Sequence, residues 1–170
     1  MHAGIHSAKC AILSALIPTH TVFPIYGPVY TGNAGKPYRL TFEVRPEYLH
    51  ARIAAPEISR IIALDYLSEI ADKCAATRRK KVLLERDIDA MIVGKALFET
   101  TKDFVRMNQG IRIALVNPHL SIEEALRNII DYASSIGGEF EYFNTVADAK
   151  RWLLLRIAEN WREERASWDD

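Results

Sequence analysis

The residues best placed to do chemistry in this chain gather in the stretch 81–94. A short apolar strand pattern at residues 82–84 leads into an acidic turn that holds Glu85, Asp87 and Asp89, and a helical pattern follows. In a sheet built from strand–helix units, ligands and partners meet the protein at the carboxyl ends of the strands. We therefore expect these three carboxylates to lie on a functional surface.

Histidines and cysteines add little catalytic potential. His119 follows an apolar run typical of a buried strand, but a lone histidine in such a turn favours a solvated position or a partner contact over catalysis. His2, His6 and Cys10 are spaced four apart, as metal ligands on one helical face would be, yet they stand in a stretch rich in Pro and Gly. We expect no metal site there, and we read Cys74, inside a helical pattern, as a small apolar core residue.

Enzyme signatures are missing from the sequence. It contains no Gly-x-Ser-x-Gly motif, no Gly-rich loop of the kind that cradles phosphate and no paired metal-ligand motif. Neither cysteine has a histidine nearby in a nucleophile-like context. We therefore expect a protein that is not an enzyme, with no catalytic residues and no cofactor.

Length and charge narrow the class of protein. The 170 residues suit one domain, and 22 basic residues balance 22 acidic ones, so no positive field exists to bind nucleic acid. The apolar run at residues 10–17 is too short to cross a membrane, and no clean signal-peptide cleavage site follows it. These features predict a cytoplasmic protein with no membrane span.

The chain divides into three parts. Residues 1–37 hold four of the seven prolines, four of the eight glycines and no acidic residue, which predicts an irregular N-terminal extension. We expect this extension to be either a loosely docked arm or an over-long predicted start. Residues 38–158 carry the periodic patterns of a folded domain, and residues 159–170 form a charged C-terminal tail.

Alternation of apolar and polar residues predicts an antiparallel hairpin at residues 38–44 and 49–53. His50 falls on its polar face, so we expect an exposed side chain. Helical spacing predicts helices over residues 56–77 and 90–108, and a capping box of Ser121 and Glu124 opens a third helix. An apolar run at residues 111–116 and alternation at residues 139–143 predict further strands, and Thr145 caps a last helix. The fold class is α/β, with a mixed sheet of about five strands (hairpin plus parallel strands) and about four helices.

This order of elements resembles the STAS domain, more closely its SpoIIAA-like (STAS/SEC14-like) branch. The likeness rests on the buried strand GIRIALV at residues 110–116 and on the closing module FEYFNTVADAKRWL at residues 140–153. It implies a regulatory, protein-binding role in a bacterial protein. In phosphoregulated members a serine between a central strand and the next helix is modified by a partner kinase.

The matching stretch departs from that pattern. Residues 85–90 contain no hydroxyl side chain, and the next one downstream is Thr100. Asp87 or Asp89 could supply a fixed negative charge where a phosphoserine would sit, or both could simply begin the helix. We therefore expect no phosphorylatable switch in this stretch.

Two functions follow as hypotheses. The first is a non-enzymatic regulatory or protein-interaction module, and a homodimer is compatible with it. The second is a binder of a lipid or another apolar small molecule, indicated by the apolar residues 91–93, 97 and 98. The expected partner contacts are Glu85, Asp87, Asp89, Lys95, Glu99, Lys102 and His119.

Overall fold

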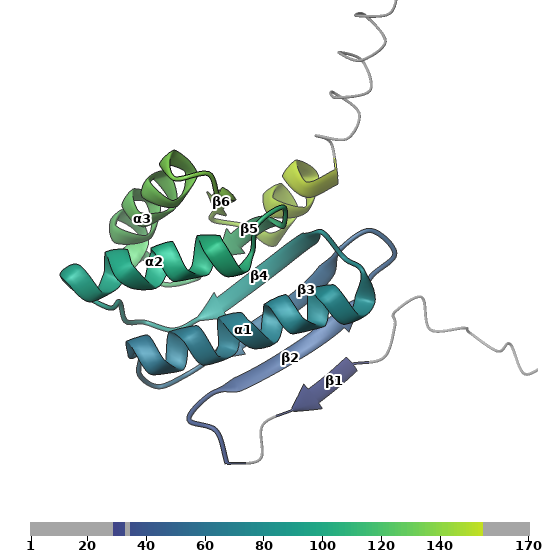
Figure 1. Cartoon of the computed structure of the whole chain (residues 1–170), viewed down its shortest axis with the longest axis horizontal. Coiled ribbons are helices and arrows are strands. Elements are labelled where there is room, and N and C mark those ends of the chain that lie inside the picture. The colour runs from purple at the N-terminus through teal and green to yellow at the C-terminus, as the bar shows by residue number, and fades with distance from the viewer. Residues whose placement is uncertain (1–28, 33–34, 155–170) are drawn as a thin grey trace, which may run out of the picture.

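The sheet that organises the molecule has six strands, which follow one another in space in the order of the chain (Figure 1). The computed structural model describes residues 29–32, as backbone, and 35–154. The first three strands pair with one another in antiparallel orientation, and the third to sixth strands pair in parallel orientation. The α/β class and the mixed sheet are confirmed. The strands are β1 (Val29–Gly32), β2 (Arg39–Val44), β3 (Leu49–Ala54), β4 (Lys81–Asp87), β5 (Arg112–Val116) and β6 (Glu139–Phe143).

Strand β1 adds one strand to the five that the sequence predicts. It pairs with β2 from Val29 opposite Glu43 to Gly32 opposite Leu40. The irregular structure predicted for residues 1–37 is therefore wrong for these four residues, because an edge strand needs only a backbone partner and tolerates nearby Pro and Gly. Residues 1–28 and the predicted tail at 159–170 lie outside the described part of the chain.

Helices cover both faces of the sheet. The helices α1 (Arg60–Thr77), α2 (Lys95–Met107) and α3 (Glu123–Ser135) lie side by side on one face (Figure 1). A fourth helix, at residues 146–154 of the described chain, packs on the other face through Ala149 and Leu153. The cap predicted for it is present, because the Asp148 N–H donates to Thr145 Oγ1 over 3.1 Å.

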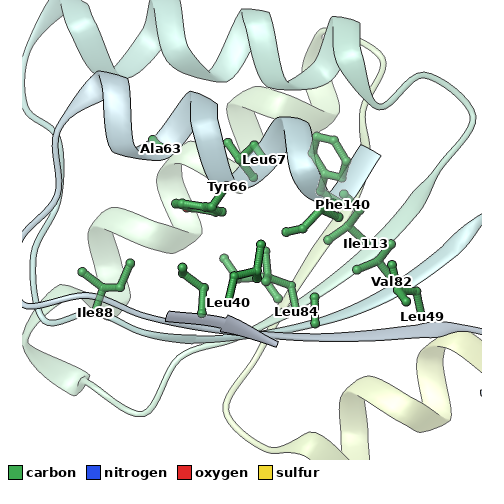
Figure 2. Packing of buried hydrophobic residues seen from close by; sticks show 14 of the residues in the cluster. Leu40, Leu49, Ala63, Tyr66, Leu67, Val82, Leu84, Ile88, Ile113 and Phe140 are labelled. Atoms are coloured by element: carbon green, nitrogen blue, oxygen red, sulfur yellow. The ribbon is translucent and has the colours of Figure 1, made fainter. Parts of the chain in front are cut away.

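Alternation along the strands builds the two cores. Leu84 of β4 points toward α1–α3, whereas its neighbour Leu83 points toward the fourth helix. Figure 2 shows Tyr66 and Leu67 of α1 above Leu40 and Leu84 of the sheet. Full burial of such an aliphatic side chain contributes about 1.5–3 kcal/mol. The larger cluster of buried apolar residues lies on this face, so it supplies most of the packing energy.

Three helix starts differ from the predicted ones. Helix α1 begins at Arg60 rather than Pro56, because the Ser59 hydroxyl accepts the Ile62 N–H over 3.2 Å. Helix α2 begins after Gly94, whose φ of 64° ends the preceding loop. The predicted capping box is wrong: Ser121 lies in a 3₁₀ turn (Leu120–Ile122), and α3 has no side-chain cap.

Candidate functional site

The parallel strands β3, β4 and β5 end at one edge of the sheet, and three predicted site residues meet there. His119 Nε2 lies 2.8 Å from Asp87 Oδ1, and its Nδ1 lies 3.9 Å from Asp89 Oδ1. The Ser121 hydroxyl donates to Asp89 Oδ1 over 2.5 Å. This edge therefore joins the end of β4 and the connection after it to the connection after β5.

Asn117 is the residue that fixes this arrangement. Its side chain is 1% exposed, its amide donates to the Ile88 carbonyl over 3.3 Å, and its Oδ1 accepts the His119 N–H over 2.8 Å. The Tyr142 hydroxyl donates to the Asn117 carbonyl over 3.3 Å. One buried amide thus ties both connections together, a role that the sequence analysis missed. Its position directly after a buried strand was the available signal.

An open cleft of about 630 Å³ adjoins this edge. Its far wall is Lys36, Tyr38 and Arg39, at the start of β2. The Tyr38 hydroxyl donates to Asp65 Oδ2 over 2.6 Å, and Lys36 Nζ lies 2.8 Å from Glu69 Oε1. Hydrogen bonding to Glu69 raises the pKa of Lys36, and burial raises the pKa of Tyr38, so this wall keeps a cation and a neutral phenol.

The hydrogen bonds at this edge place Ser121 and His119 on different carboxylates. The Ser121 hydroxyl is bonded to the Asp89 carboxylate, while His119 is bonded to Asp87, so the structure holds two separate pairs. A serine nucleophile needs the histidine as its own hydrogen-bond partner. Among residues 35–154, no group of three or more His, Cys, Asp or Glu side chains is placed to hold a metal ion.

Large apolar side chains are exposed at the same edge. Ile61 in the first turn of α1 is 81% exposed, Val93 just before α2 is 78% exposed, and Leu120 after β5 is 73% exposed. The first turns of helices that follow parallel strands lie at the carboxyl edge, and Figure 1 shows α1 and α2 starting beside the tip of β4. We call Ile61, Asp87, Asp89, Val93, His119 and Leu120 the carboxyl-edge surface.

The predicted contacts on α2 form a separate polar stripe. Lys95, Glu99 and Lys102 are spaced four and three residues apart, which places them on one face of the helix. Lys95 Nζ lies 3.3 Å from Glu99 Oε1, and the Lys95 side chain is 89% exposed. The stripe begins at the carboxyl edge and runs away from it along α2.

Glu85, the remaining predicted contact, lies elsewhere. Its side chain is on the sheet face opposite α1–α3, beside His50 and Arg52 of β3 and Glu43 of β2. His50 Nε2 contacts Glu85 Oε1, and His50 Nδ1 lies 3.7 Å from Glu43 Oε2. We call Glu43, His50, Arg52 and Glu85 the back-face cluster.

The exposed position predicted for His50 is wrong, because the side chain is 2% exposed. Strand β3 lies inside the sheet, so long side chains from β2 and β4 close over its outer face. The sequence pattern shows that this face is polar but not that neighbouring strands cover it.

Burial also sets the charge of His50. Loss of hydration and the nearby Arg52 guanidinium lower the pKa of His50, against the opposing effect of Glu85. The hydrogen bonds fit the neutral ring: Nε2–H donates to Glu85, and Nδ1 accepts from Arg52 Nη2 over 3.3 Å. The back-face cluster therefore holds an uncharged histidine.

The chain matches no protein-family model, and no curated protein shows significant similarity to it. The resemblance to the STAS domain stays a prediction. Within the described ranges, no helix is both long and apolar enough to cross a membrane.

Proposed function

We propose that this protein is a non-enzymatic regulatory or protein-interaction module of a cytoplasmic, STAS-like kind, which binds a protein partner through the carboxyl-edge surface. The observation that carries the proposal is the high exposure of Ile61, Val93 and Leu120, each more than 70% exposed and each in a segment that follows the carboxyl end of a parallel strand. Exposed apolar side chains that gather beside charged groups mark interaction sites.

Charge at the same surface indicates the partner's chemistry. The side chains of Asp87 and Asp89 are 67% and 61% exposed, so both carboxylates are open to a cation. A partner segment with apolar side chains and a neighbouring Lys or Arg would satisfy the surface. The stripe of Lys95, Glu99 and Lys102 would then form a polar rim, where charges set the rate of association more than the affinity.

The proposed module has no serine between β4 and α2 on which a phosphorylation switch could act. Residues 85–90 lack a hydroxyl side chain. The hydroxyl that reaches this loop belongs to Ser121 of the next connection, and it is already bonded to Asp89. A permanent negative charge at Asp87 and Asp89 supports constitutive rather than phosphate-gated binding.

The test is purification of the full chain from its own cells with any bound partner. The variants Leu120→Asp and Asp87→Lys should lose the partner, with an affinity at least about tenfold lower, because they place charge in an apolar contact or reverse an ion pair. Ile136→Asp is the matched control, since Ile136 is an exposed apolar residue at the opposite end of α3. A partner that both edge variants retain would contradict the proposal.

A second candidate function rests on a different observation. A cavity of about 100 Å³ lies between the sheet and helices α1–α3, with mostly apolar walls. Met91, Ile92 and Leu97, which the sequence analysis singled out, line it. The cavity supports binding of a small apolar molecule. Native mass spectrometry of the purified chain should show bound mass that denaturation releases, and a bare chain from its own cells would count against this candidate.

A further inference from the structure

The wall of this cavity contains one buried cation. Arg86 follows Val82 and Leu84 on the helix-facing side of β4, so strand alternation directs its side chain into the apolar core. It is 5% exposed and lines the cavity together with Tyr66. A charge in such a place is costly unless it is paired.

The hydrogen bonds of Arg86 all go to neutral groups. Nη1 donates to the Ile88 carbonyl over 2.7 Å, Nη2 donates to the Ala90 carbonyl over 2.5 Å, and the guanidinium also bonds to the Tyr66 side chain. Within residues 35–154, no carboxylate forms an ion pair with it. The structure therefore supplies acceptors for this cation but no counter-charge.

Other polar groups in the cavity do not provide one. The hydroxyls of Thr100 and Thr101 donate to the carbonyls of Ala96 and Leu97 over 2.7 and 2.9 Å, inside α2. The remaining walls are aliphatic or aromatic, and the principal ones are Leu67, Leu84, Ile113, Leu115, Ile130 and Phe140. An apolar chamber with one cation in its wall matches an amphipathic anion.

We propose that the cavity binds a small monocarboxylic acid, with its carboxylate on Arg86 and Tyr66 and its apolar tail between the sheet and α1–α3. This inference rests on the second candidate function and names its ligand class. A guanidinium pairs with a carboxylate through parallel N–H···O bonds, and the Tyr66 hydroxyl adds a donor.

The size of the tail follows from the cavity volume. At about 100 Å³, the chamber is two thirds of the roughly 150 Å³ of a cavity that admits benzene, which limits the ligand to a short-chain acid. Met91, Ile92 and Leu97, which line it in the connection before α2 and the first turn of that helix, are half-buried rather than buried. Ligand would enter there.

The first experiment titrates the wild-type full chain with pentanoate and with its neutral counterpart 1-pentanol, followed by NMR of methyl groups and of the Arg86 Nε–H. We expect pentanoate to bind at least tenfold more tightly and to shift both the Arg86 resonance and the methyl groups of Leu84 and Ile130. Equal affinity for the two probes would overturn the carboxylate assignment. Binding of neither probe would overturn this inference and the second candidate function together.

The second experiment compares Arg86→Gln with Arg52→Gln, which removes a guanidinium on the opposite face of the sheet. Arg86→Gln should weaken pentanoate binding at least tenfold and leave 1-pentanol binding unchanged, whereas Arg52→Gln should change neither. Unchanged pentanoate binding in Arg86→Gln would show that Arg86 only holds the carbonyls of residues 88 and 90. If Arg86→Gln does not fold, the wild-type comparison decides, and none of these outcomes affects the proposed protein-interaction surface.

Discussion

The carboxyl-edge surface and the back-face cluster each place one histidine beside two carboxylates from neighbouring strands or loops. His119 lies against Asp87 and Asp89 with 29% of its side chain exposed, and His50 lies against Glu43 and Glu85 with 2% exposed. The same residue types therefore form exposed contacts in one region and buried contacts in the other. Water weakens each contact at the edge and leaves it available to a partner, whereas burial turns the back-face contacts into part of the fold.

The largest expected difference between the two regions is in stability. His50→Ala should lower the free energy of unfolding by about 2–3 kcal/mol, because it leaves a void and removes the donor to the partly buried Glu85 carboxylate. His119→Ala should cost less than about 0.5 kcal/mol at its exposed position. Urea unfolding of both variants measures the difference, and equal losses would show that burial does not make His50 more important for stability than His119.

A smaller effect should appear as pH changes. The folded pKa of His50 is below its unfolded value, so the unfolded chain takes up the proton first as the pH falls through about 6.5. The free energy of unfolding is therefore not reduced by His50 above that pH, and it falls below that pH because protonation favours the unfolded chain. Urea unfolding at pH 7.5 and 5.5 should show a larger loss in the wild-type chain than in His50→Gln. An identical loss in both would show that the ring titrates alike in the folded and unfolded states.

The smallest effect concerns salt at the exposed edge. Asp87→Asn should change the free energy of unfolding by less than about 0.5 kcal/mol at low ionic strength. In 0.5 M NaCl even this difference should vanish, because screening acts over a few ångströms at that concentration. Thermal unfolding of wild type and variant at both salt concentrations checks it. A difference that persists in salt would mean that Asp87 is more shielded from water than its 67% exposure indicates.

Local patterns predicted most of the fold. The α/β class, the hairpin, the parallel strands and the Thr145 cap all depend on residues close in sequence, so alternation and helical spacing reveal them. They also put Asp87 and Asp89 at the carboxyl end of one strand and His119 in the loop after the next, but they did not predict that these side chains contact one another. The exact helix starts could not be predicted, because more than one residue could begin each helix. Helix α1 begins after Ser59 rather than at Pro56, and α2 begins after Gly94 rather than after Asp89.

What the sequence could not reveal depends on distant partners. Strand β1 forms because it pairs with the backbone of β2 at the edge of the sheet. His50 is buried because Glu43 and Glu85 flank it, and the Ser121 hydroxyl bonds to Asp89 instead of capping α3. Arg86 is a different case. It follows Val82 and Leu84 at a spacing of two, so the alternation already placed a cation on the apolar face, and the sequence analysis did not use that signal.

The sequential order of the strands has a consequence for how the chain reaches its native state. Each strand pairs with the strand that precedes it along the chain, and the parallel pairs are separated by a single helix crossover. Every new unit of strand and helix can therefore dock as it leaves the ribosome, without waiting for a later segment to be inserted between earlier strands. Such an order keeps contacts short in sequence and favours rapid folding from the amino end.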